Sequence, residues 1–302
     1  MPRQFSKTSG AGTVNPFNSG DVLIYFILLL SAVLCLVPVI NILAISFSNA
    51  AAADAGQVGF WPVRFTTASY NRILQDTTFF QAFLTSILRV VLGSSLTMIL
   101  TFLMAYPLSR ESREFPMRNI YMWFMIFTML FNGGLIPTYL TVIGLGMKNT
   151  IWALTVPTAV ATYNNILMMN FFRGIPKELH EAAGIDGANP LRILIDVYIP
   201  VSLPVTATLS LFCMLWHWND YFAGMIYIDD AAKQPLMTYI RNLTLQMNFE
   251  QLTAEELVKR MEVGTLTYNA AKIVVAMIPV LLVYPFLQKY FVTGIMLGSV
   301  KG

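Results

Sequence analysis

Residues 22–46 read VLIYFILLLSAVLCLVPVINILAIS, an apolar run without a single Asp, Glu, Lys or Arg. A helix needs about 20 such residues to cross a hydrocarbon core about 30 Å thick, since each residue rises about 1.5 Å. The whole chain has the same character, because 56% of its 302 residues are hydrophobic and only 12% are charged. A typical soluble domain has about 25% charged residues. The sequence therefore predicts an all-α polytopic membrane protein.

Five further segments have the length and apolar content of membrane spans. Two of them carry one cation each, Arg89 and Lys272, near an end from which a long side chain is expected to reach the membrane surface. The expected spans are residues 22–46, 80–108, 120–147, 150–172, 197–219 and 268–288. We therefore expect six transmembrane helices, with residues 1–21 as an N-terminal tail and residues 22–302 as one transmembrane domain.

The distribution of Lys and Arg predicts how the chain is inserted. An even number of spans puts both termini on one side, and short cytoplasmic connections carry the excess of cations. The side of the termini holds Arg3, Lys7, Arg110, Arg113, Arg118, Arg173, Lys177, Arg192, Lys289 and Lys301. The other side holds Arg64, Arg72, Lys148, Lys233, Arg241, Lys259 and Arg260, spread over many more residues. Both termini are therefore expected in the cytoplasm.

The last extracellular connection, residues 226–268, contains its own helix signal. Thr253 and Glu256 form a capping-box pattern, which predicts a short helix over residues 254–263. Two roles are open for such a helix: holding an extracellular partner, or only covering the mouth of the bundle.

Several kinds of chemistry find no support in the sequence. The formal charge of +3 is too small to indicate a nucleic-acid binder. Cys35 and Cys213 lie in apolar stretches, without the spacing of a metal site or a disulfide framework. The two histidines, His180 and His217, fall in separate regions, so no metal site is expected. No Gly-x-Ser-x-Gly motif is present, and an intramembrane hydrolase is not expected.

The connection between the fourth and fifth expected spans, residues 173–190, reads RGIPKELHEAAGIDGANP. Pro176 suits the first position of a helix, on which one face is expected to hold Leu179, Ala182 and Ala183. Gly184 or Gly187 can supply the left-handed residue that ends this helix. Asn189-Pro190 then resembles an N-cap followed by the first residue of a second helix. A face of alanines lets another protein approach closely, but a solvated connector explains the spacing equally well.

The same loop carries a family motif. Glu181-Ala182-Ala183, then Gly187, then Val197-Tyr198-Ile199-Pro200 resembles the EAA motif of bacterial ABC importer permeases, in which the last part is Ile-x-Leu-Pro. Val197 and Ile199 depart from that pattern by apolar exchanges that keep the spacing and the final proline. Four further stretches resemble the carbohydrate-uptake branch of the family: residues 131–137, 216–221, 284–292 and 298–302.

This resemblance implies the fold of a type I ABC importer permease, with a family core over about residues 80–290. It implies a bacterial cell membrane location and a complex with a second, similar permease, two ATPase subunits and an extracytoplasmic binding protein that delivers a sugar or oligosaccharide. The loop helix would be the coupling helix that contacts an ATPase subunit. Its functional residues would be Glu181, Ala182, Ala183, Gly184, Asp186 and Gly187.

No nucleotide chemistry is expected in this chain itself. The sequence has no Gly-x-x-x-x-Gly-Lys-Ser/Thr motif, so ATP and Mg²⁺ would be bound by the partner ATPases and this chain would hold no cofactor. We therefore expect a transport subunit rather than an enzyme, and no nucleic-acid partner.

Polar and aromatic residues inside the spans are candidates for a sugar path. Asn132 interrupts the third span, together with two glycines and a proline, and Asn164 and Asn165 lie in the fourth. Their amides suit sugar hydroxyls, although hydrogen bonds between helices are the more frequent use. Trp218 and Tyr221 could stack on sugar rings, or belong to the aromatic belt at the lipid interface. A further alternative places most of the sugar site in the partner permease.

Two other functions remain as alternatives. An ion-coupled secondary transporter needs an intramembrane carboxylate or an inverted repeat, and the spans offer neither convincingly. A membrane scaffold without transport activity would not need a shaped docking helix. Copurification of an ATPase would distinguish the expected permease from both.

Overall fold

The computed structural model describes residues 19–245 and 264–299, and within these ranges the chain is helical, without strands. The first helices are α1 (Ser19–Ser46), α2 (Ala50–Asp54), α3 (Ala68–Gln75) and α4 (Thr77–Ser109). Next come α5 (Arg118–Leu130), α6 (Leu135–Gly144), α7 (Ile151–Thr155), the 3₁₀ turn η1 (Val156–Thr158) and α8 (Thr162–Arg173). The chain continues through α9 (Lys177–Ile185), α10 (Pro190–Ile193), the π-helical turn η2 (Leu194–Tyr198), α11 (Ile199–Val201) and α12 (Leu203–Asn219). The last elements are α13 (Phe222–Tyr227), η3 (Ala231–Lys233), α14 (Leu236–Leu245) and α16 (Thr265–Ser299).

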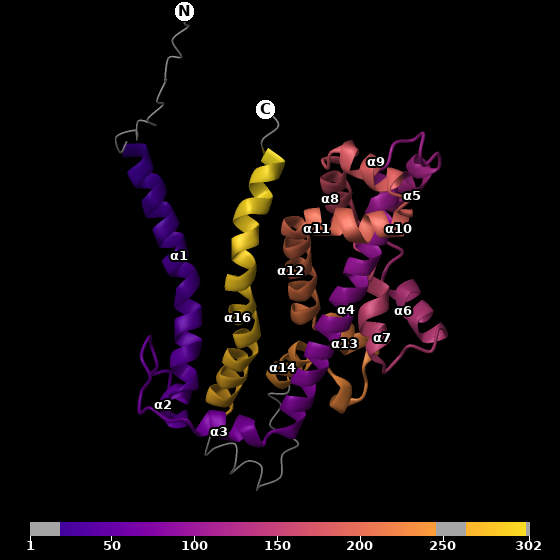
Figure 1. The fold of residues 1–302 in the computed structure, drawn as a ribbon. Helices are drawn as coiled ribbons and strands as arrows, with labels where there is room; N and C mark the ends of the chain where they lie inside the picture. Colours follow the sequence, from indigo (N-terminus) through magenta and orange to yellow (C-terminus); the bar gives the residue numbers. More distant parts are fainter. Residues whose placement is uncertain (1–18, 246–263, 300–302) are drawn as a thin grey trace, which may run out of the picture.

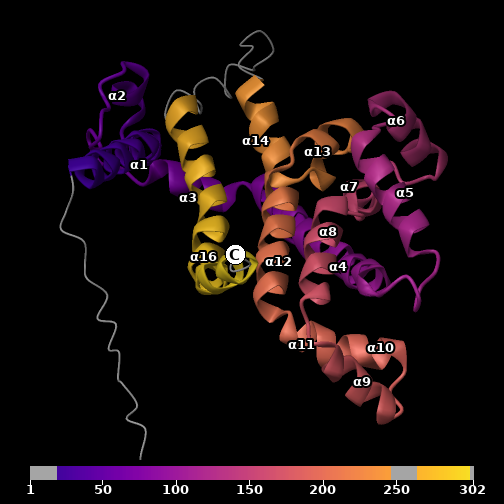
Figure 2. The same ribbon diagram turned by 90° about the horizontal axis from the view of Figure 1, so that it is seen from above.

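The long helices form a bundle with α4 at its centre. Helix α4 packs against α12 and α8, α12 packs against α16, and α16 packs against α1 (Figure 1). Seen from above, α1 and α2 lie at one edge, and α5 and α6 lie at the opposite edge (Figure 2). The first turn of α1, the last turn of α16 and the short helix α9 all lie toward the same end of the bundle (Figure 1). The expected even number of spans predicts this arrangement of the two chain ends.

Three of the expected spans are single helices. The stretches Gly20–Ser46, Thr77–Ser109 and Thr265–Val283 are each long and apolar enough to cross a membrane, in agreement with the first, second and sixth expected spans. Side chains of α1 from Val22 to Leu34 are almost all exposed on its surface. An apolar exterior of this kind suits lipid or another membrane subunit rather than water.

The third and fifth expected spans are bent. Helices α5 and α6 meet at an angle of 113°, and the break falls in the Asn-Gly-Gly stretch that interrupts the third span. The fifth span was expected to begin at Val197, which is wrong. Residues Pro190–Val201 form a transverse helix that meets α12 at 87°, so the lengthwise helix begins at Leu203. Pro200 and Pro204 flank this bend, and neither has an N–H to continue a helical ladder through it.

The fourth expected span is divided into α7, η1 and α8. Pro157 lies inside η1, and the chain leaves helical geometry again before Thr162. Within residues 19–245 and 264–299, three single helices and two bent pairs therefore have the composition of spans, and the total of six stays a prediction. The helix expected over residues 254–263 lies outside the described residues.

Two large apolar clusters fill the bundle, and a third, smaller one joins α6, α7 and α13 through Val142, Ala153 and Tyr227. The larger cluster lies toward the end that carries α9 and joins α4, α8, α12 and the transverse helix, with Met168, Phe172 and Tyr198 among its members. The second cluster, around Phe79, Trp218 and Leu236, joins α3, α4, α12, α14 and α16 toward the opposite end. The core thus connects the loop helices at one end of the bundle to the long helices.

The two cations expected to reach the membrane surface do not do so, and this expectation is wrong. Arg89 is 0% exposed and Lys272 is 1% exposed. Each is buried against a carboxylate from a distant part of the chain, Arg89 against Asp220 and Lys272 against Asp76. A buried charge is stable only when it is paired, and both partners lie at helix ends, Asp220 after α12 and Asp76 before α4.

Candidate functional site

Helices α9 and α10 form a compact unit at one end of the bundle (Figure 1). The two helices predicted for this loop are therefore confirmed, with α9 beginning at Lys177, one residue later than expected. Gly187 has a φ of +77°, a conformation that L side chains rarely adopt. The turn is closed by hydrogen bonds from the Ala188 N–H to the Ala183 carbonyl and from the Gly187 N–H to the Gly184 carbonyl, each 3.0 Å. Gly187 therefore ends α9 and turns the chain toward α10.

The start of α10 has the predicted cap. The Asn189 side chain accepts a hydrogen bond of 2.8 Å from the Arg192 N–H, and Pro190 occupies the first helical position. The cap satisfies a backbone N–H that would otherwise lack a partner, so the direction of the transverse helix is fixed at its start.

Polar contacts hold α9 against the connection that follows α4. Lys177 pairs with Glu111, and the Arg110 guanidinium donates a hydrogen bond of 2.5 Å to Nδ1 of His180. Arg110 also lies over the rings of Tyr106 and Tyr198, at 4.7 and 5.0 Å from their centroids. Helix α9 is thus bound both to α4 and to the transverse helix, in addition to its covalent connections.

The charge states of these groups favour the same contacts. Burial of the His180 ring, and then the nearby Arg110 charge, lower the pKa of His180. A neutral imidazole can accept the Arg110 hydrogen bond at Nδ1. The hydrogen bond between Lys177 and Glu111, reinforced by their opposite charges, raises the pKa of Lys177 and lowers that of Glu111. Both side chains of this exposed pair are therefore charged at neutral pH.

The outer surface of α9 combines apolar and acidic side chains. Ile185 is 87% exposed at the end of the helix, which is unusual for an isoleucine outside an interface. Glu181, Ala182 and Asp186 are also exposed, and within the described residues Glu181 forms no ion pair. The predicted face of Leu179, Ala182 and Ala183 is only partly correct, because Ala183 packs inward on the larger core cluster. The exposed surface is therefore Leu179, Glu181, Ala182 and Ile185.

The three asparagines considered for a sugar path lie in different surroundings. Asn132 is exposed at the break between α5 and α6, where its side-chain oxygen accepts from the Gly134 N–H at 2.9 Å. Asn164 and Asn165 are buried between helices. The amide of Asn164 donates to Cys213 Sγ at 3.2 Å, and that of Asn165 to Met104 Sδ at 3.8 Å. The structure therefore places only Asn132 at a surface.

Trp216 and Trp218 face opposite directions, as their spacing on a helix predicts. Trp216 is 62% exposed and Trp218 is 6% exposed. The Trp218 ring packs edge-on against Phe83, with 5.8 Å between the ring centroids. Tyr221 is exposed at the end of α12, and the Arg241 guanidinium lies 4.3 Å from the centroid of its ring. Of these side chains, Tyr221 and Trp216 are accessible and Trp218 is part of the core.

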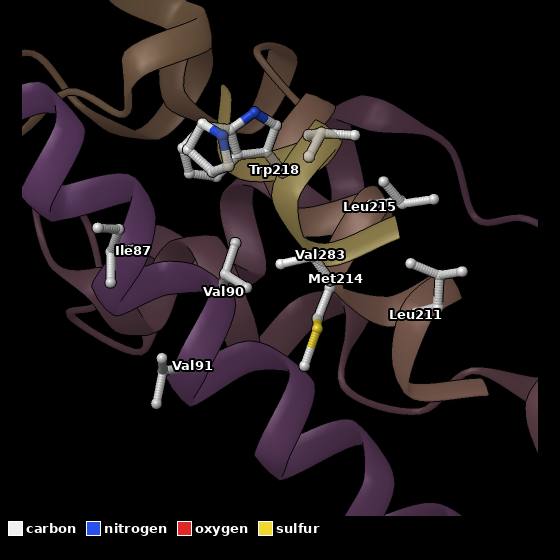
Figure 3. A pocket seen from close by; sticks show the side chains of 10 residues that line it. Ile87, Val90, Val91, Leu211, Met214, Leu215, Trp218 and Val283 are labelled. Atoms are coloured by element: carbon white, nitrogen blue, oxygen red, sulfur yellow. The ribbon is translucent and has the colours of Figure 1, made fainter. Parts of the chain in front are cut away.

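Trp218 also lines a pocket of about 190 Å³ between α4, α12 and α16 (Figure 3). The other walls are aliphatic or thioether side chains and a proline: Ile87, Val90, Val91, Leu211, Met214, Leu215, Pro279, Val280 and Val283. Sugar hydroxyls need hydrogen-bond partners, and this lining offers almost none. The pocket therefore does not have the chemistry of a sugar site.

Sequence reasoning missed a polar contact between α4 and α12. Arg89 donates to the Asp220 carbonyl oxygen at 2.6 Å and to the Asp220 carboxylate. One helical turn along, a Cβ at Gly93 would lie 2.5 Å from the ring of His217, so only glycine allows the two helices this close. An intramembrane Arg and an Asp at the end of a later span were the available signals, although 131 residues separate them.

A second polar cluster joins α4 to α14 and α16. Asp76 caps α4 by accepting from the Phe79 N–H at 3.0 Å, and its other oxygen lies 2.9 Å from Lys272 Nζ. The hydroxyls of Tyr239 and Tyr268 donate to the same oxygen at 2.8 Å. Over residues 19–245 and 264–299, no group of three or more His, Cys, Asp or Glu residues could hold a metal ion. The contacts of Arg89 with Asp220 and of Lys272 with Asp76 are ion pairs that join separate helices or their caps.

The chain is thus a bundle of apolar helices, two pairs of which are bent, with the exposed helix α9 at one end. Residues 92–296 match the family described as "Binding-protein-dependent transport system inner membrane component". The chain belongs to this family, and is a multi-pass protein of the bacterial inner membrane. The resemblance inferred from the EAA-like loop is thereby confirmed at the level of the family.

Named relatives agree with this assignment. The chain is 40% identical to the "Polygalacturonan/rhamnogalacturonan transport system permease protein YtcP" of Bacillus subtilis (strain 168), over 93% of this chain and 98% of the relative. It is 32% identical to the "Melibiose/raffinose/stachyose import permease protein MelC" of the same organism, over 70% of this chain and 74% of the relative.

A solved structure has the same fold. One chain of a bacterial ABC transporter involved in the import of the acidic polysaccharide alginate superposes with a TM-score of 0.85 at 33% identity. The match covers 91% of this chain and 99% of the solved chain. The overall fold is therefore one that this chain shares with a chain of a bacterial ABC transporter.

Proposed function

We propose that this chain is one of two membrane subunits of an ATP-driven importer, which takes an oligosaccharide from an extracytoplasmic binding protein. Two ATPase subunits would bind ATP and Mg²⁺ on the cytoplasmic side, because this sequence has no phosphate-binding loop of its own. The chain would contribute half of the pathway and no catalytic residue. Both termini would lie in the cytoplasm, as the distribution of Lys and Arg favours.

The observation that carries this proposal is that α9 is exposed and firmly held at the same time. Its outer surface presents Glu181 and Ile185, while Lys177 and His180 bind the helix to the end of α4. A helix attached in this way transmits displacement to the bundle instead of absorbing it in a loose loop. We therefore assign α9 as the coupling helix, with Glu181 as its charged contact to an ATPase.

The remaining motif residues would each have a part in that contact. Ala182 permits close approach at the surface, Ala183 seats the helix on the core, and Gly184 adds no side-chain bulk. Asp186 and Gly187 form the exposed turn into α10. At the exposed positions Ala182 and Asp186, a change should disturb coupling before it disturbs folding.

For the cargo, we propose an acidic oligosaccharide that contains uronate residues. The named substrates of the 40% identical relative and of the solved alginate transporter are polymers of sugar acids. The surface around Tyr221 has suitable chemistry, because Arg241 places a guanidinium beside an exposed aromatic ring. A carboxylated sugar needs a stacking surface and a cationic hydrogen-bond donor.

The path candidates divide according to their exposure. Asn132 and Tyr221 have accessible side chains and are proposed to contact the passing sugar. Asn164, Asn165 and Trp218 are buried, and we propose that they join helices. The pathway would then run along the surface between this chain and the second permease.

Glu181→Lys tests the coupling role. Reversing a charge at a docked contact costs at least about 2 kcal/mol, which predicts a fall of about 30-fold or more in ATPase binding or ATP-driven uptake. Uptake is measured in vesicles that contain the assembled transporter, and ATPase binding by copurification. Asp54→Lys is the matched control, because Asp54 is an exposed acid at the end of the bundle opposite α9.

The control variant should retain uptake and ATPase binding. Normal ATPase binding and uptake in Glu181→Lys, at equal amounts of chain in the membrane, would contradict the coupling assignment. The cargo is tested separately by competition. Oligogalacturonate or oligomannuronate should inhibit uptake of a labelled uronate oligosaccharide, whereas a neutral glucose oligomer of equal length should not.

A further inference from the structure

The loop between α2 and α3 is apolar although it connects two short helices at one end of the bundle. Residues 55–63 read AGQVGFWPV, without a charged side chain between Asp54 and Arg64. Trp61 is 82% exposed and Phe60 is 56% exposed. Loops that face water are usually polar, so the exposed apolar side chains of this loop indicate surroundings other than water. We call residues 58–65 the aromatic loop.

Hydrogen bonds hold the aromatic loop beside α1. The side-chain amide of Asn41 donates to the Gly59 carbonyl at 2.8 Å and to the Val58 carbonyl at 3.3 Å. Farther along, the Val63 N–H donates to the Ser48 hydroxyl at 3.0 Å. The loop is therefore fixed at both ends, and its exposed rings are held in place rather than free to turn inward.

These contacts set the depth of the loop in the membrane. Asn41 lies five residues before the end of α1 at Ser46, which is about 7.5 Å along the helix axis. Since Gly59 is bonded to Asn41, the loop returns alongside the last turns of an apolar span. Phe60 and Trp61 follow directly, so they lie level with the last turns of α1.

Further aromatic rings continue the same surface. Phe65 is 69% exposed and stacks on Phe47, whose ring stacks in turn on Tyr70, with centroid distances of 5.4 and 4.7 Å. The Tyr70 hydroxyl lies 2.8 Å from the Ser46 hydroxyl at the end of α1. Trp and Tyr rings have an apolar body and a polar group, and they concentrate where acyl chains meet headgroups.

We propose that the aromatic loop is a lipid-binding anchor, in which Phe60 and Trp61 insert into the headgroup and upper acyl region of the leaflet opposite α9. Burial of two aromatic side chains in that region fixes the depth of α1 and of α3 in the membrane. The occupant is the bilayer because the loop lies at the α1 edge of the molecule and turns back along the span (Figure 1). A protein partner that docks from the aqueous side would instead meet a loop that extends away from the membrane.

The test measures the depth of the Trp61 ring by fluorescence. The assembled transporter is placed in vesicles of phosphatidylcholine that carries bromine either near the headgroup or deep in the acyl chains. The chain has five tryptophans, so the emission of Trp61 is obtained as the difference between the wild type and Trp61→Phe. Trp218→Phe, which removes a ring that is 6% exposed, is the matched buried control.

The Trp61 emission should be quenched about twofold more by the shallow bromine than by the deep bromine, and little by iodide in the water. Strong quenching by iodide would overturn the proposal, because the ring would then be in water. Equal insensitivity to iodide and to both bromolipids would also overturn it, because a protein surface would then cover the loop. Neither result depends on uptake or on the cargo, so the proposed function is tested independently.

Discussion

Asp220→Asn should destabilise the chain through the charge that it leaves unpaired on Arg89. Arg89 is 0% exposed and its guanidinium donates to both the carboxylate and the backbone carbonyl of Asp220. Removing one partner of a buried ion pair costs about 3–5 kcal/mol, because the other charge stays buried without compensation. The Asp220 side chain is 18% exposed, so water reaches one partner and we expect the lower end, about 3 kcal/mol.

Asparagine is the right replacement because it separates charge from capping. The Oδ1 atom of Asp220 accepts hydrogen bonds from the Phe222 N–H at 2.9 Å and the Ala223 N–H at 3.3 Å, and thereby caps α13. An asparagine keeps this acceptor and loses the charge. Asp220→Ala loses both, and should therefore cost about 1 kcal/mol more than Asp220→Asn.

Thermal unfolding of the purified chain in detergent, followed by tryptophan fluorescence, measures the effect. A loss of about 3 kcal/mol should lower the midpoint by roughly 6 °C for a chain of this size. Asp196→Asn is the control, since its pair with Arg192 is exposed and is worth no more than about 0.5 kcal/mol. The double variant Arg89→Met with Asp220→Asn should be more stable than the sum of the single losses predicts. Strict additivity would refute the reasoning, because it would mean that the two groups do not interact.

Two further predictions concern the turn after α9 and the cap of α4. Gly187→Ala should cost about 1–2 kcal/mol and reduce ATP-driven uptake, since the φ of +77° is strained for any L side chain. Gly144→Ala, in open space at the end of α6 and away from α9, should retain uptake, and equal effects of the two would contradict this. Burial raises the pKa of Asp76, but hydrogen bonds from Lys272, Tyr268 and the Phe79 N–H outweigh it and lower this pKa to about 2. The stabilisation from Asp76 should therefore be complete above about pH 5 and disappear as the pH falls toward 2, a slope that Asp76→Asn should lack in thermal unfolding.

The straight spans and the loop helices could be predicted because their signals are local. The apolar run of α1 needs no partner to be recognised, and the turn at Gly187 and the cap at Asn189 are set by residues within one helical turn. The bend after Val201 was harder to predict from the sequence. Prolines mark where a helix can break, but packing on the core decides that residues 190–201 run across the bundle.

The buried ion pairs could not be predicted for a different reason. A single cation in an apolar segment suggests that its side chain extends to the membrane surface. The alternative is an ion pair with a carboxylate from a distant segment, and that carboxylate can be identified only once the helices are assembled. Lys272 and Asp76 are nearly 200 positions apart in the sequence. The hydroxyls of Tyr239 and Tyr268, which come from further segments of the chain, complete the same cluster. Likewise, the spacing of Trp216 and Trp218 separates their faces, but only packing shows which ring is inside.

The separation of Arg89 from Asp220 has a consequence for biosynthesis. The ribosome makes α4 well before α12, so the second span must enter the bilayer while its guanidinium has no carboxylate to meet. An arginine in an inserting helix costs up to about 2.5–3.5 kcal/mol, the value at the helix centre, and the many aliphatic residues of α4 must outweigh that cost alone. During synthesis the Arg89 charge therefore remains unpaired in the membrane until α12 is inserted and Asp220 can pair with it.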